Sequence, residues 1–458
     1  MDQKKFAEIS RREFIRRAAC AAVGTVAMHA TIRDLRLMNA AMAQSNVNDY
    51  KAMVCLFLAG GNDSNNLIVP TVTSEYANYA AIRTPVLALP QGSLANLLIP
   101  GTSNIYVDPA GHSYGLHPAC SELAQLFSHA DQVTQWQTSA PDQPPTTGWG
   151  GRCADLMNSV NTNAPVSMSI SLAGANTLEV GNITAQYSVS TSGAISLQGV
   201  SGNRLAALTN ILGLKYANLQ AQAYAGVAQH SIQSGSLLNN AITNTAGTFF
   251  TNPFPTTVTN FVSNTHFNSS LAPQLQMIAR LIEAGSRAAA SGGFGMRRQI
   301  FFCQVGGYDL HTGQTNYTAA NPSGVLTGAH SNLLSEVSQS LYAFQRAMEQ
   351  LGLSQKVTAF TASDFGRTFP SNGQGSDHGW GSHHLILGGA VKGGQTYGTF
   401  PTLTVNGPND TSTGRWIPTT AIDQYFATLA TWFGLDSSNL ATVFPNVGRF
   451  ATSNIGFV

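Results

Sequence analysis

The sequence predicts an α/β protein with a mainly parallel sheet flanked by helices, an architecture in which buried strands alternate with helical segments. Two observations lead to this fold class. Short apolar runs, typical of buried strands, alternate along the chain with amphipathic helical patterns, and several of these runs end at glycine-rich turns. The expected strands are residues 53–58, 132–137, 300–305, 357–361 and 384–387. The expected helices are residues 119–130, 275–290 and 333–351, where apolar side chains recur at helical spacing.

The middle of the chain has a different composition. Residues 161–271 are rich in Ser, Thr, Asn, Ala and Gly, and within them residues 205–231 have a helical pattern. We expect this region to be an insertion or cap on one α/β domain that spans residues 49–458.

The N-terminal 43 residues have the features of an export signal. Arg11 and Arg12 precede a weakly apolar stretch, which ends in small residues at positions 41–43. The pattern predicts recognition by the twin-arginine export machinery and a periplasmic or secreted protein, with a basic amphipathic helix as the alternative. Because the apolar stretch is shorter than the ~20 residues of a membrane span, we expect no transmembrane span in the mature chain.

Charge and cysteine content narrow the function classes. Only 10% of residues are charged, against about 25% in typical domains. Without residues 1–43 the chain keeps 23 − 8 = 15 basic and 22 − 4 = 18 acidic residues. This balance argues against a nucleic-acid partner. Cys55 and Cys303 lie in expected strands and read as buried thiols, whereas Cys120 and Cys153 could pair in an oxidising compartment.

Three glycine-rich turns that carry acids or histidines follow three of the expected strands. In parallel sheets the carboxyl ends of the strands share one edge, where ligands bind, so we expect the turns to converge. Aspartate in a single such turn is usually turn chemistry, and the prediction therefore depends on the three occurring together. The turns supply Asp63, then Asp309 and His311, then Asp364, Arg367, Asp377, His378, His383 and His384.

Aspartate and histidine together predict a divalent metal site. These side chains suit Zn²⁺, Mn²⁺ or Mg²⁺, and the group is large enough for one or two ions. Paired ions can clamp the attacking and leaving oxygens of a phosphoryl-type displacement. Arg367 is a candidate for binding an anionic oxygen.

The motifs FLAGGNDSNNLIVP, GGYDLHTGQ, SDFGRT and SDHGWGSHHLILGGAVKGG make the chain resemble the DUF1501 family of exported bacterial proteins, from about residue 49 to the C-terminus. That family is similar to a branch of the alkaline phosphatase/sulfatase superfamily of metal-dependent hydrolases. The resemblance implies that Asp63, Asp377 and His378 share one metal ion. It also implies that Asp309 and His311 bind a second, completed by His383 or His384.

Some positions depart from the family pattern. The family often has glutamate where this chain has Asp364, and often a Ser-His-Phe element where this chain reads SAPDQPPTTGW. The superfamily's nucleophile normally follows the second core strand, where Ser139, Thr146 and Thr147 lie. The two threonines are the better candidates for a catalytic hydroxyl, with helix capping as the alternative.

Three functions follow from these observations. The first is an exported metal-dependent hydrolase of a small anionic ester, of phosphate or sulfate. The second is a non-catalytic exported metal-binding or assembly protein on the same fold. The third is a metal-free serine esterase with Ser113 as nucleophile in a G-x-S-x-G pattern, although no strand leads directly into that pattern and no helix directly follows it.

Overall fold

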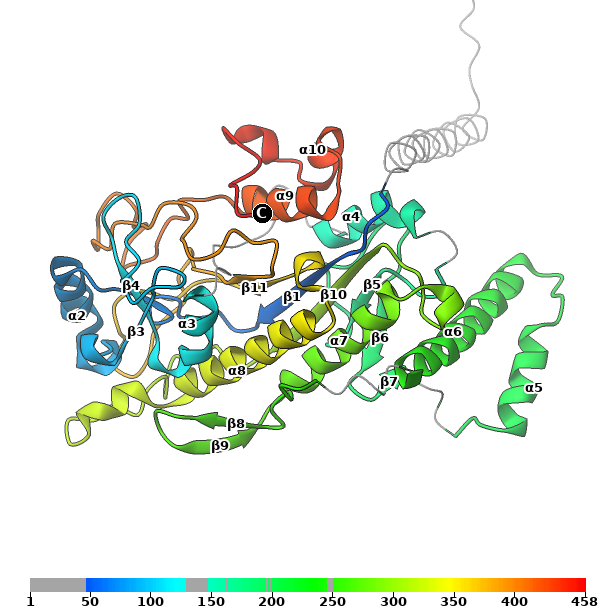
Figure 1. Ribbon diagram of the computed structural model, residues 1–458, viewed down its shortest axis with the longest axis horizontal. Coiled ribbons are helices and arrows are strands. Elements are labelled where there is room, and N and C mark those ends of the chain that lie inside the picture. Colours follow the sequence, from blue (N-terminus) through cyan, green and yellow to red (C-terminus); the bar gives the residue numbers. More distant parts are fainter. Residues whose placement is uncertain (1–46, 129–146, 162–163, 195–196, 198, 245–249) are drawn as a thin grey trace, which may run out of the picture.

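The computed structural model describes residues 47–128, 147–161, 164–194, 197, 199–244 and 250–458 of the chain (Figure 1). Its centre is a seven-stranded sheet in the order β12-β11-β1-β10-β5-β6-β7. β1 pairs in parallel with both β10 and β11, and β5 pairs in parallel with β10 and β6. The end strands β12 and β7 are antiparallel to their neighbours. The strands are β1 Lys51–Leu58, β5 Ser169–Ser171, β6 Tyr187–Ser190, β7 Gly193–Ala194, β10 Arg298–Val305, β11 Val357–Ser363 and β12 Ile386–Leu387.

Helices cover both faces of this sheet, which explains why its central strands are apolar without alternation. Figure 1 shows α3, α7 and α8 on one side and α4, α9 and α10 on the other. On the second side, Trp149 of α4 stacks on Phe426 of α9 with ring centroids 4.4 Å apart. These helices are α3 Ser121–Ser128, α4 Trp149–Met157, α7 Ala272–Ser286, α8 Ala329–Gln350, α9 Ile422–Phe433 and α10 Leu440–Val443.

Smaller elements surround the sheet. A three-stranded antiparallel sheet has the order β2-β4-β3, and β8 and β9 form a two-stranded antiparallel hairpin. None of the described helices is long and apolar enough to cross a membrane. The strands of these two sheets are β2 Ile68–Pro70, β3 Ala95–Asn96, β4 Tyr114–Leu116, β8 Thr257–Asn260 and β9 Thr265–Asn268. Three further helices are α2 Thr73–Leu87, α5 Asn203–Leu212 and α6 Leu219–Asn244.

The α/β class and the mainly parallel sheet are confirmed. The expected strands at 53–58, 300–305 and 357–361 correspond to β1, β10 and β11, while the one at 384–387 shortens to β12. The strand expected at 132–137 lies outside the described residues. The helix expected at 205–231 is two helices, α5 and α6, which Gly213 and the segment after it separate.

The region expected as an insertion does more than cap the core. Residues 161–271 supply β5, β6 and β7 to the main sheet, in addition to α5, α6 and the β8–β9 hairpin. The four cysteines of the described chain are all free and buried, so Cys120 and Cys153 form no disulfide here.

The serine considered for a metal-free esterase lies in a β-hairpin. Ser113 forms an antiparallel bridge with Val107, and its hydroxyl lies 2.7 Å from that of Thr71. A nucleophile elbow requires a sharp turn from strand to helix. This position therefore lacks the backbone arrangement on which the esterase prediction depends.

Candidate metal centre

The three glycine-rich turns meet at one edge of the main sheet. Leu58 of β1 is paired with Val305 of β10 on one side and with Ser363 of β11 on the other. The three strands therefore end side by side, and the turns that follow them are neighbours. This is the convergence that the strand-and-turn pattern predicts.

Two glycines after β1 allow the turns to approach closely. Gly60 has a φ of +113°, and a Cβ there would lie 2.5 Å from the backbone nitrogen of Asp309. Gly61 has a φ of +82°, and a Cβ there would lie 2.1 Å from the ring of Phe365. Any other residue at these positions would separate the β1 turn from the turns after β10 and β11.

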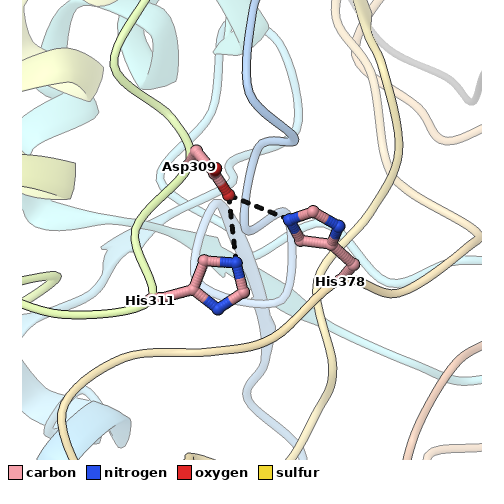
Figure 2. A group of neighbouring side chains, drawn as sticks. All are labelled: Asp309, His311 and His378. Atoms are coloured by element: carbon pink, nitrogen blue, oxygen red, sulfur yellow. Dashed lines mark hydrogen bonds and ion pairs between the residues drawn. The ribbon is translucent and has the colours of Figure 1, made fainter.

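Three side chains from two of these turns point toward one another (Figure 2). The carboxylate oxygen Oδ1 of Asp309 lies 3.2 Å from Nε2 of His311 and 3.0 Å from Nε2 of His378. One donor atom from each residue lies within 4.8 Å of the other two. The side chains are open to solvent, with exposed fractions of 57% for Asp309, 44% for His311 and 52% for His378.

These spacings fit the donor set of a divalent ion. Zinc binds imidazole nitrogen and carboxylate oxygen at about 2.0–2.2 Å, so two ligands of one tetrahedral ion are separated by about 3.4 Å. The contacts of 3.0 and 3.2 Å to Asp309 are close to that separation. Among the described residues, no other group of three or more His, Cys, Asp or Glu side chains brings its ligand atoms close enough together to share one ion.

A second carboxylate fixes the orientation of His311. Nδ1 of His311 lies 3.0 Å from Oδ1 of Asp377, and the amide nitrogen of Asn372 donates to the same oxygen at 2.9 Å. An ionised carboxylate only accepts hydrogen bonds, so Nδ1 of His311 carries the proton. Nε2 of His311 faces the carboxylate of Asp309, and this second carboxylate contact requires either a second proton on the ring or a cation between the two atoms.

Arg367 contacts Asp309 from the interior side of the cluster. Its side chain is fully buried, and Nη2 donates to Asp309 at 2.5 Å and to the carbonyl oxygens of Gly60 and Tyr308. Nε donates to the carbonyl of Gly61 and Nη1 to that of Ser376. These contacts make Arg367 a residue that joins the turns and positions Asp309, a different role from the anion contact that the sequence favours.

The local charges keep both exposed carboxylates ionised. Hydrogen bonds from His378 and Arg367 lower the pKa of Asp309 below its ordinary value. Hydrogen bonds from Asn372 and His311 lower the pKa of Asp377 in the same way. The cluster therefore presents negative charge beside two imidazoles at neutral pH, which favours a bound cation.

The comparison with protein families covers this cluster. Residues 254–443 match the family described as "Protein of unknown function (DUF1501)". This match supports the DUF1501 resemblance for that part of the chain, which contains Asp309, His311, Arg367, Asp377 and His378. No curated protein matches the chain.

Asp63 lies N-terminal to the DUF1501 match and has different neighbours from those expected. Its carboxylate is buried and forms an ion pair with Arg83 of α2, and the amide nitrogen of Gln314 donates to the same oxygen. The side-chain oxygen of Gln314 accepts from Ser376, the residue before Asp377, at 2.7 Å. The structure thus links Asp63 to the edge of the cluster through Gln314 and does not place it against Asp377.

The two other histidines predicted as metal ligands, His383 and His384, are separate from the cluster. His383 is buried, lies 3.3 Å from the hydroxyl of Ser64 through Nδ1, and stacks on Phe400 at 4.7 Å. His384 is buried with Nδ1 at 3.3 Å from the hydroxyl of Thr361. Burial lowers the pKa of His383 to about 4 and that of His384 well below its ordinary value, so both are neutral.

The candidate nucleophiles lie outside the DUF1501 match as well. Thr146 is outside the described residues. Thr147 precedes α4, and its hydroxyl and carbonyl oxygens accept from Nη1 of Arg152 at 3.3 and 2.6 Å. Asp364 lies at the edge where the turns meet, and its carboxylate accepts from the backbone nitrogen of Gly60 at 2.6 Å.

Sequence reasoning missed four residues around the turns. Arg83 and Gln314 contact Asp63, Asn372 contacts Asp377, and Nε2 of His330 lies 3.0 Å from the side-chain oxygen of Asn62. Gln314 is part of the GGYDLHTGQ motif, and its position three residues after His311 was the available signal. Arg83 is one of few charges in a weakly charged chain, which is a reason to look for a buried carboxylate partner. Nothing local in the sequence distinguishes Asn372 or His330.

Proposed function

We propose that the protein binds a divalent metal ion through Asp309, His311 and His378 and uses it to hydrolyse a small anionic ester, of phosphate or sulfate. One observation supports this most strongly: Oδ1 of Asp309 lies close to the Nε2 atoms of both His311 and His378. The other ring nitrogen of His311, Nδ1, contacts the carboxylate of Asp377. Carboxylate–histidine pairs of this kind orient the histidine ligands of metal sites.

The composition of the site favours zinc and an open coordination position. Two imidazole nitrogens and one carboxylate oxygen suit Zn²⁺, and three protein ligands are typical of catalytic rather than structural zinc. The exposure of all three side chains leaves room for a substrate. A bound ion would polarise an ester oxygen and lower the pKa of water, which is the chemistry that hydrolysis needs.

Residues around the three proposed ligands position them. Arg367 holds Asp309 in place, Asp377 fixes the tautomer of His311, and the ring of Phe365 lies 4.1 Å from that of His378. Because the donors of Arg367 are directed at Asp309 and at backbone carbonyls, the charge of an anionic substrate would be met by the ion.

A second candidate function is that of a non-catalytic metal-binding protein. The observation in its favour concerns the nucleophile, since the hydroxyl of Thr147 is engaged by Arg152. With Thr147 held by Arg152, ester hydrolysis at the proposed site would use water as the nucleophile.

Turnover of simple esters separates the two candidates. Purified full-length protein is assayed with p-nitrophenyl phosphate and p-nitrophenyl sulfate, after chelation and after addition of zinc or manganese. We expect metal-dependent hydrolysis that is lost in His311→Ala and retained in His266→Ala, which removes a histidine of the β8–β9 hairpin. Metal binding at Asp309, His311 and His378 without hydrolysis of either ester would favour the binding protein.

A further inference from the structure

A two-helix arm extends from one end of the molecule. It consists of α5, the connecting segment of residues 213–218, and the N-terminal half of α6 as far as Ile232. Figure 1 shows α5 at the opposite end of the protein from α2. Further along α6, Leu238 and Ile242 are buried in the core, so the helix is anchored there while its first turns extend outward.

Large apolar side chains are exposed on this arm. Ile211 is 54% exposed, Leu214 is 57% exposed and Tyr224 is 76% exposed. Single exposed apolar residues are common on protein surfaces. Here Tyr224 lines an apolar cleft of about 380 Å³, and Ile211 is next in sequence to Leu212, which lines it too. Most of the cleft is formed by aliphatic side chains, among them Leu205, Leu208, Leu212 and Ile232.

The arm and the residues around it in the sequence carry basic side chains and no acidic ones. No aspartate or glutamate occurs between Glu179 and Glu283, an interval of 103 residues. The arm itself carries Arg204 and Lys215, and both are exposed. An apolar surface that has basic residues and lacks acidic ones is complementary to a surface that is apolar and negatively charged.

The size and chemistry of the cleft indicate which apolar partner fits. A helix with its side chains is about 10 Å across, so only one face of it could enter the cleft, and its polar backbone ends and its other side chains would stay outside. An extended peptide would need hydrogen-bond partners for its backbone, and the cleft offers mainly aliphatic carbon. An acyl chain needs no such partners and has a suitable cross-section.

We propose that the arm docks on the surface of an anionic lipid bilayer. Leu214, Ile211 and Tyr224 enter the interfacial region, the cleft receives an acyl chain, and Lys215 and Arg204 lie at the level of the lipid phosphates. Tyrosine, leucine and lysine in this combination are typical of segments that lie in the membrane interface. This inference does not depend on the metal centre.

Vesicle sedimentation tests the proposal. Full-length purified protein is mixed with vesicles of phosphatidylglycerol and phosphatidylethanolamine, or of phosphatidylcholine alone, at 0.05 and 0.5 M salt. We expect binding to the anionic vesicles that weakens at high salt. The double variant Leu214→Ser/Tyr224→Ser should bind at least tenfold more weakly, and Lys215→Glu should lose about fivefold or more, since each basic residue near such a surface adds about that factor.

The matched control is Phe261→Ser, which removes an apolar side chain that is 70% exposed in the β8–β9 turn, outside the arm. It should bind vesicles as the unaltered protein does. The proposal is overturned by absence of binding to anionic vesicles, or by equal loss in the control and the arm variants. A change of oligomeric state in the arm variants without vesicle binding would assign the arm to self-association instead and would also overturn it.

Discussion

His311 is the residue on which the interpretation of the cluster depends most. One of its ring nitrogens is directed at Asp377 and the other at Asp309. A neutral imidazole has only one proton, so the second carboxylate contact requires either a second proton or a metal ion.

Replacing Asp377 with asparagine tests this reasoning. Asp377→Asn removes the charge that fixes the His311 tautomer, and we expect zinc affinity to fall about 10- to 100-fold, the usual cost of losing an outer-shell carboxylate. The measurement is competition for zinc against a calibrated chelator. Asp436→Asn, which alters an exposed aspartate that caps a short helix, is the control. Unchanged affinity in Asp377→Asn would show that Asp377 has no part in the site.

A second residue-scale prediction concerns Asp63. Burial alone would raise its pKa, but Arg83, His330 and Gln314 together lower it below its ordinary value. Asp63→Asn leaves Arg83 charged, buried and unpaired, so we expect the free energy of unfolding to fall by about 3–5 kcal/mol. Bound metal at Asp309, His311 and His378 should remain.

Urea unfolding and metal analysis of the same samples measure both quantities. Loss of one metal equivalent with little change in stability would support the resemblance-based assignment of Asp63 as a metal ligand, and would contradict the structural ion pair.

At the scale of elements, α8 and the segment before α3 place two neutral histidines under the turns. Burial and the proximity of His330 lower the pKa of His117 to about 3. Burial lowers that of His330 to about 4, even though Asp63 acts in the opposite direction. Nε2 of His330 lies 3.0 Å from the side-chain oxygen of Asn62, in the turn after β1.

These shifts predict that acid destabilises the fold. An unfolded histidine has a pKa near 6.5, so between about pH 6.5 and pH 4 the unfolded chain binds more protons than the folded one. The free energy of unfolding therefore keeps its full value above pH 6.5. Below that pH it falls by about 1.4 kcal/mol per pH unit for each histidine.

We expect His330→Gln, which can still donate to Asn62, to reduce this slope by about 1.4 kcal/mol per pH unit. Urea unfolding at pH 7, 6 and 5 measures the slope for both proteins. Identical slopes would mean that His330 is not held neutral by its surroundings.

The elements also show what the sequence could predict. β1, β10 and β11 are buried on both faces, so their apolar runs are unambiguous, and the turns after them had to share an edge. The interruption between α5 and α6 was missed because the apolar spacing continues past Gly213. The contribution of residues 161–271 to the main sheet was missed because β5, β6 and β7 have only two to four residues each.

At the scale of the whole molecule, the sequence predicted where the candidate site lies better than it predicted which residues form it. Asp309, His311 and His378 come together at the predicted edge, with Asp377 behind His311. Which residues form the site depends on the directions of the side chains and on long-range partners such as Arg83 and Gln314. Spacing along the chain reveals neither of these. The same limit applies to His383 and His384, which are adjacent in sequence to a turn of the site but face the interior.

Zinc stoichiometry is the most direct test of the central claim, that Asp309, His311 and His378 form one metal site. Metal-stripped full-length protein is titrated with Zn²⁺ in a calorimeter, alongside His311→Ala, His378→Ala and the control His266→Ala. We expect one equivalent to bind tightly to the unaltered protein and to the control, and this equivalent to be lost in both cluster variants. Absence of tight binding, or the same single equivalent in all four proteins, would contradict the claim.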